Sequence, residues 1–183
     1  MRSADPGQCS AIVNFPPPAA ADNCGIASAA CYPAPGKPFP IGRTRITCTA
    51  SDLAGNKSSC SFDVIVVDRE APRIQSISAT PALLLPPNHQ MVPVVVRVSA
   101  FDNCSAVTSR IIGVTSSDPT SGTSSADKSP DWRITGPLTL QLRAEISQPN
   151  RSRTYTITIE SRDASGNVAT RNVNVVVPAK GLR

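Results

Sequence analysis

The sequence has few of the residues on which enzyme sites depend. Aromatic residues make up 4% of the 183 residues, and there is a single histidine. No set of nucleophile, base and orienting group can be assembled around this residue, His89. The sequence also lacks a glycine-rich phosphate loop, and no pair of carboxylates stands out as glycosidase acids. We therefore expect a protein that is not an enzyme, with His89 in a structural role.

Long apolar runs, helical periodicity and concentrated charge are missing as well. The longest apolar stretches, at 64–67 and 92–96, are too short to span a membrane, so we expect no membrane insertion. The net charge is +5, and residues 1–68 carry five basic and five acidic side chains, so the whole excess lies in residues 69–183. This diffuse charge lacks the interleaved aromatic residues of nucleic-acid grooves, so we expect no nucleic-acid partner.

What the sequence has instead is alternation between aliphatic and polar residues, broken by 18 prolines and 10 glycines. A repeat of two residues predicts strands with one face turned inward, and short strands separated by turn residues are typical of an all-β sandwich. The stretches with this repeat are 9–15, 46–50, 60–66, 92–98, 138–142, 155–159 and 173–177.

Three landmarks occur twice in the same order, which indicates two copies of one module. They are Asp-Asn-Cys at 22–24 and 102–104, Asp-x-x-Gly-Asn at 52–56 and 163–167, and a valine-rich strand at 64–67 and 173–177. We predict two tandem immunoglobulin-like β-sandwich domains, at 1–68 and 73–183, joined by a short linker at 69–72. Each Asp-x-x-Gly-Asn segment lies between two strands and predicts a hairpin turn.

A polar stretch at 115–131 interrupts the second domain. It consists mainly of Ser, Thr, Asp, Gly and Pro, which predicts a long surface loop. Trp132, the only tryptophan, follows directly. Two interpretations stay open: an inward side chain that fills the core, or an exposed ring that stacks on a ligand.

The first domain resembles a hyalin repeat (HYR) domain over about residues 5–68. The matching segments are Pro-Gly-Gln-Cys-Ser-Ala (6–11), Ala-Asp-Asn-Cys-Gly (21–25), Phe-Pro-Ile-Gly (39–42), Cys-Thr-Ala-Ser-Asp-Leu-Ala-Gly-Asn (48–56) and Cys-Ser-Phe (60–62). The second domain resembles, more loosely, related bacterial immunoglobulin-like repeats through Pro-Pro-Asn-His-Gln-Met-Val-Pro-Val (86–94) and Asp-Trp-Arg-Ile-Thr-Gly-Pro-Leu (131–138). The resemblance implies immunoglobulin-like sandwiches from extracellular multidomain proteins, associated with adhesion and without catalytic activity.

Two departures from the family pattern concern cysteines. Hyalin repeats usually carry a Cys-Pro strand upstream of the Gly-Gln-Cys motif, which this sequence does not contain, so Cys60 would lack its usual partner. Cys104 keeps the Asp-Asn-Cys motif in a domain with no second cysteine. We therefore expect a piece of a longer array, or a first strand supplied by another chain.

Six cysteines in a small, aromatic-poor chain indicate disulfides and an oxidising compartment. Cys9 and Cys48 lie at inward positions of strands that should face each other, and Cys24 and Cys31 close a short loop. We predict the disulfides Cys9–Cys48 and Cys24–Cys31. A connectivity that uses Cys60 in place of Cys9 or Cys48 stays open, because sequence cannot fix pairing.

Acidic and amide side chains should gather at the end of the second domain that receives the linker. Oxygen ligands suit Ca²⁺, and a calcium site there would stiffen the linker. The alternative is that these residues only close Asx turns and hairpins. The candidate calcium ligands are Asp68, Glu70, Asp102, Asn103 and Asp163.

The sequence as a whole predicts an extracellular, non-catalytic adhesion or structural module of a larger surface or matrix protein. Its partners would be other modules of the same array, or a protein or glycan at a cell surface. Two alternatives are an accessory glycan-binding or spacer module of a secreted hydrolase, and a subunit of a fibre or homo-oligomer assembled by strand complementation. No cofactor is required, and Ca²⁺ is the one candidate.

Overall fold

The structure is a computed structural model that describes residues 1–118, 130–148 and 150–179. These residues form thirteen β-strands and no helix, so the all-β prediction is confirmed. The chain divides into two compact units, Met1–Glu70 (unit 1) and Ala71–Arg183 (unit 2), and the division falls inside the expected linker. Among the described residues there is no helix of the length and apolarity that a membrane span requires.

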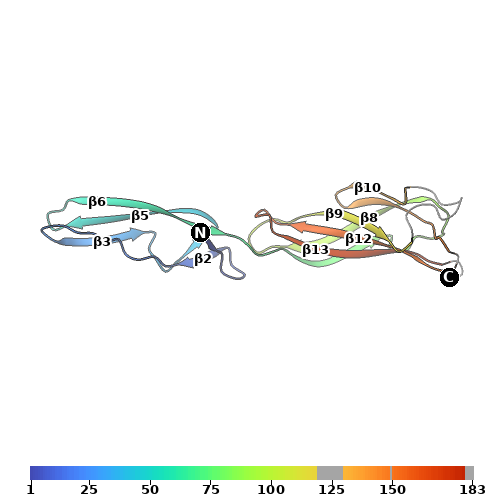
Figure 1. The fold of residues 1–183 in the computed structure, drawn as a ribbon, viewed down its shortest axis with the longest axis horizontal. Helices are drawn as coiled ribbons and strands as arrows, with labels where there is room; N and C mark the ends of the chain where they lie inside the picture. The colour runs from blue at the N-terminus through green and yellow to red at the C-terminus, as the bar shows by residue number, and fades with distance from the viewer. Residues whose placement is uncertain (119–129, 149, 180–183) are drawn as a thin grey trace. The chain divides into compact units, whose positions relative to one another are not determined.

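Unit 1 contains two sheets (Figure 1). Its larger sheet has the order β1-β6-β5-β3, with β1 parallel to β6 and the other pairs antiparallel, and β2 and β4 form a separate antiparallel pair. The strands are β1 (Arg2–Ser3), β2 (Ser10–Val13), β3 (Ile26–Tyr32), β4 (Lys37–Pro40), β5 (Gly42–Asp52) and β6 (Lys57–Val67).

The core of unit 1 comes from the inward positions of both sheets, as the alternation predicts. The rings of Phe15, Phe39 and Phe62 close one side of it, with Phe15 edge-on to Phe39 at 6.3 Å and to Phe62 at 5.1 Å between ring centroids. The buried residues of this core are Ala11, Phe39, Ile46, Cys48, Val64 and Val66.

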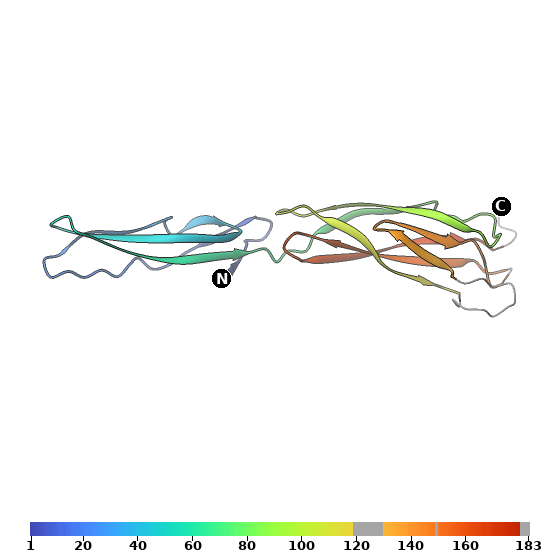
Figure 2. The ribbon, with the colours of Figure 1, turned by 90° about the horizontal axis from the view of Figure 1, so that it is seen from above.

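Unit 2 is a fuller sandwich with sheets of four and three strands, in the orders β10-β11-β8-β7 and β13-β12-β9 (Figures 1 and 2). Its core is aliphatic, with Tyr155 as its fully buried aromatic residue. The strands are β7 (Arg73–Thr80), β8 (Met91–Phe101), β9 (Thr108–Ser116), β10 (Trp132–Gly136), β11 (Thr139–Arg143), β12 (Arg153–Arg162) and β13 (Val168–Val177).

The two units share the strand order of an immunoglobulin sandwich. In each unit the last hairpin is joined by an earlier strand, giving β3-β5-β6 in unit 1 and β9-β12-β13 in unit 2. The opposite sheet contains β2–β4 in unit 1 and the equivalent β8–β11 in unit 2. Unit 2 adds β7 and β10 to that sheet, which completes the four-plus-three arrangement of the constant-type domain.

The repeated turns have the same geometry in both units. In the hairpin between β5 and β6, Asn56 donates its backbone N–H to Asp52 Oδ1 at 2.8 Å and its side-chain amide to Asp52 Oδ2 at 2.7 Å. Asn167 makes both bonds to Asp163 at 2.8 Å in the hairpin between β12 and β13. The glycine before each asparagine has a positive φ, 90° at Gly55 and 92° at Gly166. Residues with a side chain rarely adopt this backbone conformation. The Asp-x-x-Gly-Asn repeat is therefore a hairpin signature, as predicted.

The predicted surface loop at 115–131 is wrong at both of its ends. Strand β9 continues to Ser116, while Asp118 and Asp131 are buried, with 7% and 4% of their surface exposed. Polar residues are usually exposed, whereas here Asp131 forms an ion pair with the buried Arg153 and Asp118 accepts hydrogen bonds from Ser147. Residues 119–129 lie outside the described residues.

Candidate functional site

The disulfide of unit 1 joins Cys31 to Cys48, so both predicted pairings are wrong. Cys31 lies on β3 and Cys48 directly opposite it on β5, with 3.9 Å between their Cα atoms. Cys9 comes just before β2, in the other sheet, where its side chain is exposed. Ile26–Tyr32 is the strand β3 rather than part of the short loop expected between Cys24 and Cys31, and this strand places Cys31 opposite Cys48.

The remaining cysteines lie in different surroundings. Cys24 is exposed, and its backbone N–H donates to Asp22 Oδ1 at 2.7 Å in an Asx turn. Cys60 lies on β6 opposite Cys48, and it too is exposed. Cys104 is partly buried, and its backbone N–H donates to Asp102 Oδ1 at 2.9 Å, which repeats the Asp22–Cys24 turn in unit 2.

Unit 1 also holds a pocket of about 420 Å³ against the β5–β6 hairpin. The residues that line it come mainly from the segment 18–22 and from β5 and β6, including Cys48, Ala50 and Cys60. The ends of the hairpin, including Asp52 and Lys57, also line it. A hydrogen bond from the Asn56 side chain lowers the pKa of Asp52 below its ordinary value of 3.8.

The predicted calcium ligands of unit 1 hold its C-terminal end together. The backbone N–H of Glu70 donates to Asp68 Oδ1 at 3.0 Å, and Asp68 is buried. Glu70 Oε2 accepts a hydrogen bond of 2.9 Å from the backbone N–H of Gly7. Both carboxylates therefore accept backbone hydrogen bonds, and the bond from Gly7 to Glu70 joins the two ends of the unit.

In unit 2, the structure brings two of the predicted ligand segments together. Asp102 Oδ1 accepts hydrogen bonds from the backbone N–H groups of Cys104 and Ser105, at 2.9 and 3.1 Å. Ser105 Oγ in turn accepts from the backbone N–H of Ala164, next to Asp163, at 3.0 Å. The loop that contains Asn103 and the hairpin turn of Asp163 are therefore neighbours. Turn chemistry accounts for these contacts, and calcium binding stays a prediction.

Trp132 lies at the start of β10 and is partly buried against the core of unit 2. Its ring meets that of Tyr155 edge-on, with 6.4 Å between ring centroids. This arrangement agrees with the core-filling interpretation of Trp132.

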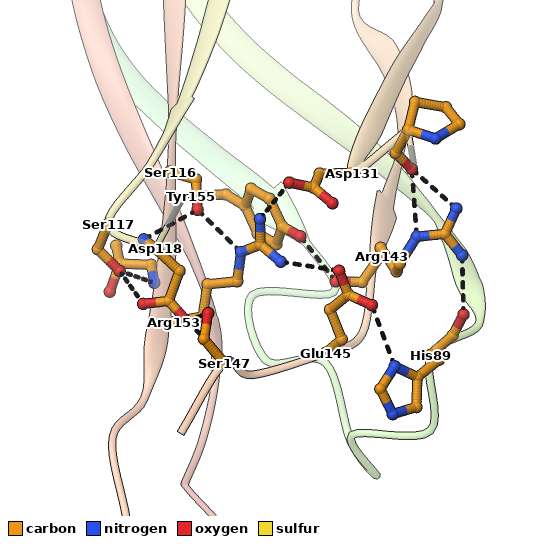
Figure 3. A network of polar contacts seen from close by, with 12 residues as sticks. His89, Ser116, Ser117, Asp118, Asp131, Arg143, Glu145, Ser147, Arg153 and Tyr155 are labelled. Carbon is orange, nitrogen blue, oxygen red and sulfur yellow. Dashed lines mark hydrogen bonds and ion pairs between the residues drawn. The ribbon is translucent and has the colours of Figure 1, made fainter. Parts of the chain in front are cut away.

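The main polar site of the structure is a buried network around Arg153, which the sequence analysis did not predict (Figure 3). The Arg153 guanidinium is 1% exposed and forms ion pairs with Asp131 and with Glu145, the latter at 3.1 Å. Its Nε donates to Ser116 Oγ at 2.8 Å, and its Cζ lies 4.7 Å from the centre of the Tyr155 ring. Four segments of unit 2 thus meet at one cation.

A second buried arginine extends the network (Figure 3). The Arg143 side chain donates to the carbonyl oxygens of Pro130, at 2.8 and 3.2 Å, and His89, at 3.0 Å. Tyr155 Oη donates to the Arg143 carbonyl oxygen at 2.9 Å, and His89 Nδ1 lies 3.0 Å from Glu145 Oε2. These contacts link His89 to the buried network.

Asp118 forms the outer part of the same network (Figure 3). Its Oδ2 accepts hydrogen bonds from the backbone N–H and the hydroxyl of Ser147, at 3.0 and 2.8 Å. Asp118 and Asp131 lie on either side of residues 119–129, so the network holds both chain segments that flank this stretch. Each of its carboxylates has at least one oxygen engaged by an arginine, serine or histidine side chain, and these contacts fix the segments that carry the residues.

Burial and charge act on the titratable groups of the network in opposite directions. Burial raises the pKa of the Tyr155 phenol, against the lowering effect of the Arg153 charge. Burial by itself lowers the pKa of Arg153, but the interactions with Tyr155, Asp131 and Glu145 outweigh it, and the pKa is raised. Arg153 therefore stays charged and Tyr155 stays a neutral hydrogen-bond donor in the folded protein.

One sequence signal could have revealed this network. Arg153 continues the inward set of Tyr155, Ile157 and Ile159 with the same repeat of two, so alternation places a charged residue at an inward position. Buried charges are almost always paired, which should have directed attention to partner carboxylates. Nothing in the spacing of Asp131 and Glu145 identifies them as those partners.

Residues 1–66 match the family described as "HYR domain". These residues belong to the HYR domain family. The resemblance inferred from the cysteine and turn motifs is confirmed, and the HYR domain ends within β6, shortly before the boundary between the units. The disulfide Cys31–Cys48 and the pocket beside Cys60 thus belong to the HYR domain.

Two groups of relatives resemble this chain. The rat protein "Sushi, von Willebrand factor type A, EGF and pentraxin domain-containing protein 1" is 42% identical over 79 residues, 42% of this chain and 2% of that protein. The "Serine-rich adhesin for platelets" of Staphylococcus aureus strain MRSA252 is 31% identical over 139 residues, 74% of this chain and 8% of that protein. The chain spans only these small fractions of the relatives it matches.

Solved structures with some likeness include the protocadherin gamma B2 extracellular cadherin domains 3–6. That structure has a TM-score of 0.40 and 12% identity, over 95% of this chain and 43% of the other. The fibronectin(III)-like modules of Clostridium thermocellum CbhA give a TM-score of 0.34 and 10% identity, over 90% and 85% of the two chains. With TM-scores this low, neither structure is informative about the HYR domain or about unit 2.

Proposed function

We propose that this chain is a non-catalytic adhesion and structural module of a larger extracellular protein. The observation that carries the proposal is the HYR domain at residues 1–66, together with similarity to a bacterial adhesin over 139 residues. A disulfide within the HYR domain supports an oxidising, extracellular setting.

The physical character of the two units supports this role. Their inward faces are filled by apolar cores, and the polar cluster around Arg153 is engaged in ion pairs that fix chain segments. Rigid sandwiches of this kind present loops and strand edges to partners, and they serve as spacers between other modules.

The glycan-binding alternative would need an exposed aromatic platform. Tyr155 is fully buried, and Trp132 is engaged with Tyr155 and with the core of unit 2. Neither ring is placed like the flat, solvent-facing residue on which a sugar stacks. The positions of Trp132 and Tyr155 therefore give no support to the glycan-binding alternative.

The fibre alternative required a first strand supplied by another chain. Residues 2–8 are instead bonded within unit 1: Arg2 and Ser3 pair with β6, Asp5 bonds to β2, and Gly7 donates to Glu70. This internal pairing argues against strand complementation at the start of the chain.

Retention of coated beads under flow tests the adhesion proposal. Beads that carry the full chain are passed over surfaces coated with fibrinogen, fibronectin, collagen or albumin, and the same chain is applied to a glycan array. We expect retention on a matrix protein but not on albumin, and unchanged retention for Trp132→Phe. Beads retained no better than on albumin, or glycan binding that Trp132→Phe abolishes, would contradict the proposal.

Calcium binding is tested separately, on the full chain. If Asp102 and the neighbouring turn residues hold Ca²⁺, the thermal midpoint rises with added CaCl₂ and does not respond to MgCl₂. Asp102→Asn should remove the response, and Asp63→Asn, on β6, should leave it unchanged. A midpoint that CaCl₂ does not move would leave Asx-turn closure as the whole role of these residues.

A further inference from the structure

Three cysteines of unit 1 lie in one row across its larger sheet. The register of β3 with β5 places Cys31 opposite Cys48, and the register of β5 with β6 places Cys60 opposite the same Cys48. Directly opposite residues of an antiparallel sheet project from the same face. Cys48, on the middle strand, therefore has a cysteine on each side.

Both neighbours of Cys48 lie at distances that a disulfide can bridge. A residue in a central antiparallel strand directs its N–H and C=O toward the same neighbouring strand, so one of its two cross-strand pairs is hydrogen-bonded and the other is not. The separation of 3.9 Å between the Cα atoms of Cys31 and Cys48 marks theirs as the closer, non-hydrogen-bonded pair. Cys48 and Cys60 then form the hydrogen-bonded pair, with Cα atoms about 5.5 Å apart. Disulfides commonly span about 4.4–6.8 Å.

The thiol of Cys60 is free and can be reached from solvent. Cys60 is exposed, while Cys48 is 3% exposed. Both residues are among those that line the pocket of about 420 Å³, so Cys60 and one half of the disulfide border the same cavity. Thiol–disulfide exchange requires such access, because the attacking thiolate must reach the sulfur directly.

We propose that Cys60 is an exchange thiol whose substrate is the Cys31–Cys48 disulfide of its own domain. Cys60 gives its proton to a base in solvent, and its thiolate attacks Cys48 Sγ. The bond between Cys48 and Cys60 forms as the bond between Cys48 and Cys31 breaks, and Cys31 leaves as a thiolate that takes up a proton from water. The exchange moves one disulfide and neither consumes nor releases electrons.

The order of the three cysteines suits this displacement. The attacking thiolate must approach the central sulfur from the side opposite the leaving sulfur. Cys60 and Cys31 lie on opposite sides of Cys48 in the row, so Cys60 approaches Cys48 from the strand on the side away from Cys31.

The exchange changes which strand is covalently held. Among the described strands, β3 lies at the edge of its sheet and pairs with β5 alone, and the Cys31–Cys48 bond fastens it there. After exchange the disulfide joins β5 to β6, which are already a hairpin, and β3 is held by hydrogen bonds alone. The site thus converts a cross-linked edge strand into one that can be released.

Disulfide mapping of the full chain tests the proposal directly. The oxidised protein is incubated in mildly alkaline buffer, quenched with acid and digested with pepsin, which avoids exchange during digestion. We expect peptides joined through Cys48–Cys60 to accumulate beside those joined through Cys31–Cys48. A digest that contains only Cys31–Cys48 peptides after prolonged incubation overturns the proposal.

Two variants give independent readouts. Cys60→Ser should yield Cys31–Cys48 alone, whereas Cys24→Ser, which removes another exposed thiol of unit 1, should give the wild-type mixture. Cys31→Ser should form Cys48–Cys60 under air. If Cys48 and Cys60 both remain open to alkylation in a Cys31→Ser chain with an unchanged far-UV spectrum, the two residues do not meet and the proposal fails.

Discussion

Strands β2 and β8 occupy equivalent places in the two units, but their outer edges are covered in different ways. The eleven-residue β8 is paired along much of its length by β7. The four-residue β2 is covered by one residue: Asp5 donates its backbone N–H to Ser10 at 2.8 Å and accepts the N–H of Ile12 on its carboxylate at 2.8 Å. The short edge of β2 is thus closed by a single residue, whereas the longer edge of β8 is covered by a strand.

The units also differ in what reinforces them. Unit 1 has the smaller buried core among the described residues and a disulfide between two strands of one sheet. Unit 2 has the larger core and the ion-pair network around Arg153. Small cores commonly rely on covalent cross-links, while a buried network fixes one arrangement of loops at a cost in desolvation.

The largest effect should follow from breaking the network of unit 2. Arg153→Ala leaves Asp131 and Glu145 buried without their cation, and we expect a loss of about 3–5 kcal/mol in the free energy of unfolding. Arg162→Ala, on the same strand with an exposed side chain, should cost less than about 1 kcal/mol. Urea unfolding followed by Trp132 fluorescence measures the free energy of unfolding of both variants. Similar losses in the two variants would show that the buried ion pairs of Arg153 do not stabilise unit 2 more than an exposed pair does.

The disulfide of unit 1 should give the next largest effect. Cys48→Ala removes a cross-link between residues 17 apart in sequence and also prevents its exchange with Cys60. A loop of this length predicts a loss of about 3 kcal/mol through the unfolded state. Far-UV circular dichroism during urea unfolding measures it, with Cys24→Ala as the control that should change little. A Cys48→Ala chain as stable as Cys24→Ala would contradict the assigned pairing.

The contact that closes β2 should contribute less than the disulfide. Asp5→Ala removes the charged acceptor of the Ile12 N–H, and we expect a loss of about 1–2 kcal/mol from unit 1. Asp63→Ala removes a carboxylate that forms a surface ion pair with Arg43, and it should have almost no effect. The same urea experiment compares the free energies of unfolding of the two variants. Equal losses would mean that the hydrogen bond from Ile12 to Asp5 does not stabilise β2.

The smallest effect concerns the hairpin turn of unit 1. Since Asn56 lowers the pKa of Asp52, Asn56→Ala should move that pKa up toward 3.8, while Asn167→Ala in unit 2 should leave it unchanged. The lowered pKa favours folding above 3.8, and this contribution is lost as the pH falls through the folded-state value. An NMR titration of the Asp52 carboxyl measures this pKa. If Asn56→Ala leaves the Asp52 pKa unchanged, the hydrogen bond from Asn56 is not what lowers it.

The sequence allowed the sandwich fold to be predicted because the inward residues repeat every second position. The two hairpin turns were equally clear, because Asp and Asn at fixed spacing around a glycine leave few conformations. Strand β3 gave no such signal, since nearly all of its residues are exposed and its apolar residues do not alternate. Missing that strand led directly to the wrong partners for Cys31 and Cys48.

The network of unit 2 shows the other limit of sequence reasoning. Alternation places Arg153 inward, but its partners Asp131 and Glu145 come from segments without a regular pattern. Which carboxylate meets the guanidinium depends on how the flanking segments cross the end of the sandwich. Periodicity within a strand carries no information on that crossing.

Unfolding in urea with and without dithiothreitol, recorded through Trp132 fluorescence and far-UV circular dichroism, tests the central claim most directly. The claim is that unit 1 depends on its disulfide and unit 2 on its buried ion pairs. Trp132, the only tryptophan, lies in unit 2. We predict that the reductant lowers the midpoint of one dichroism transition and leaves the Trp132 midpoint unchanged. A Trp132 midpoint that falls as far as the dichroism transition would contradict the account.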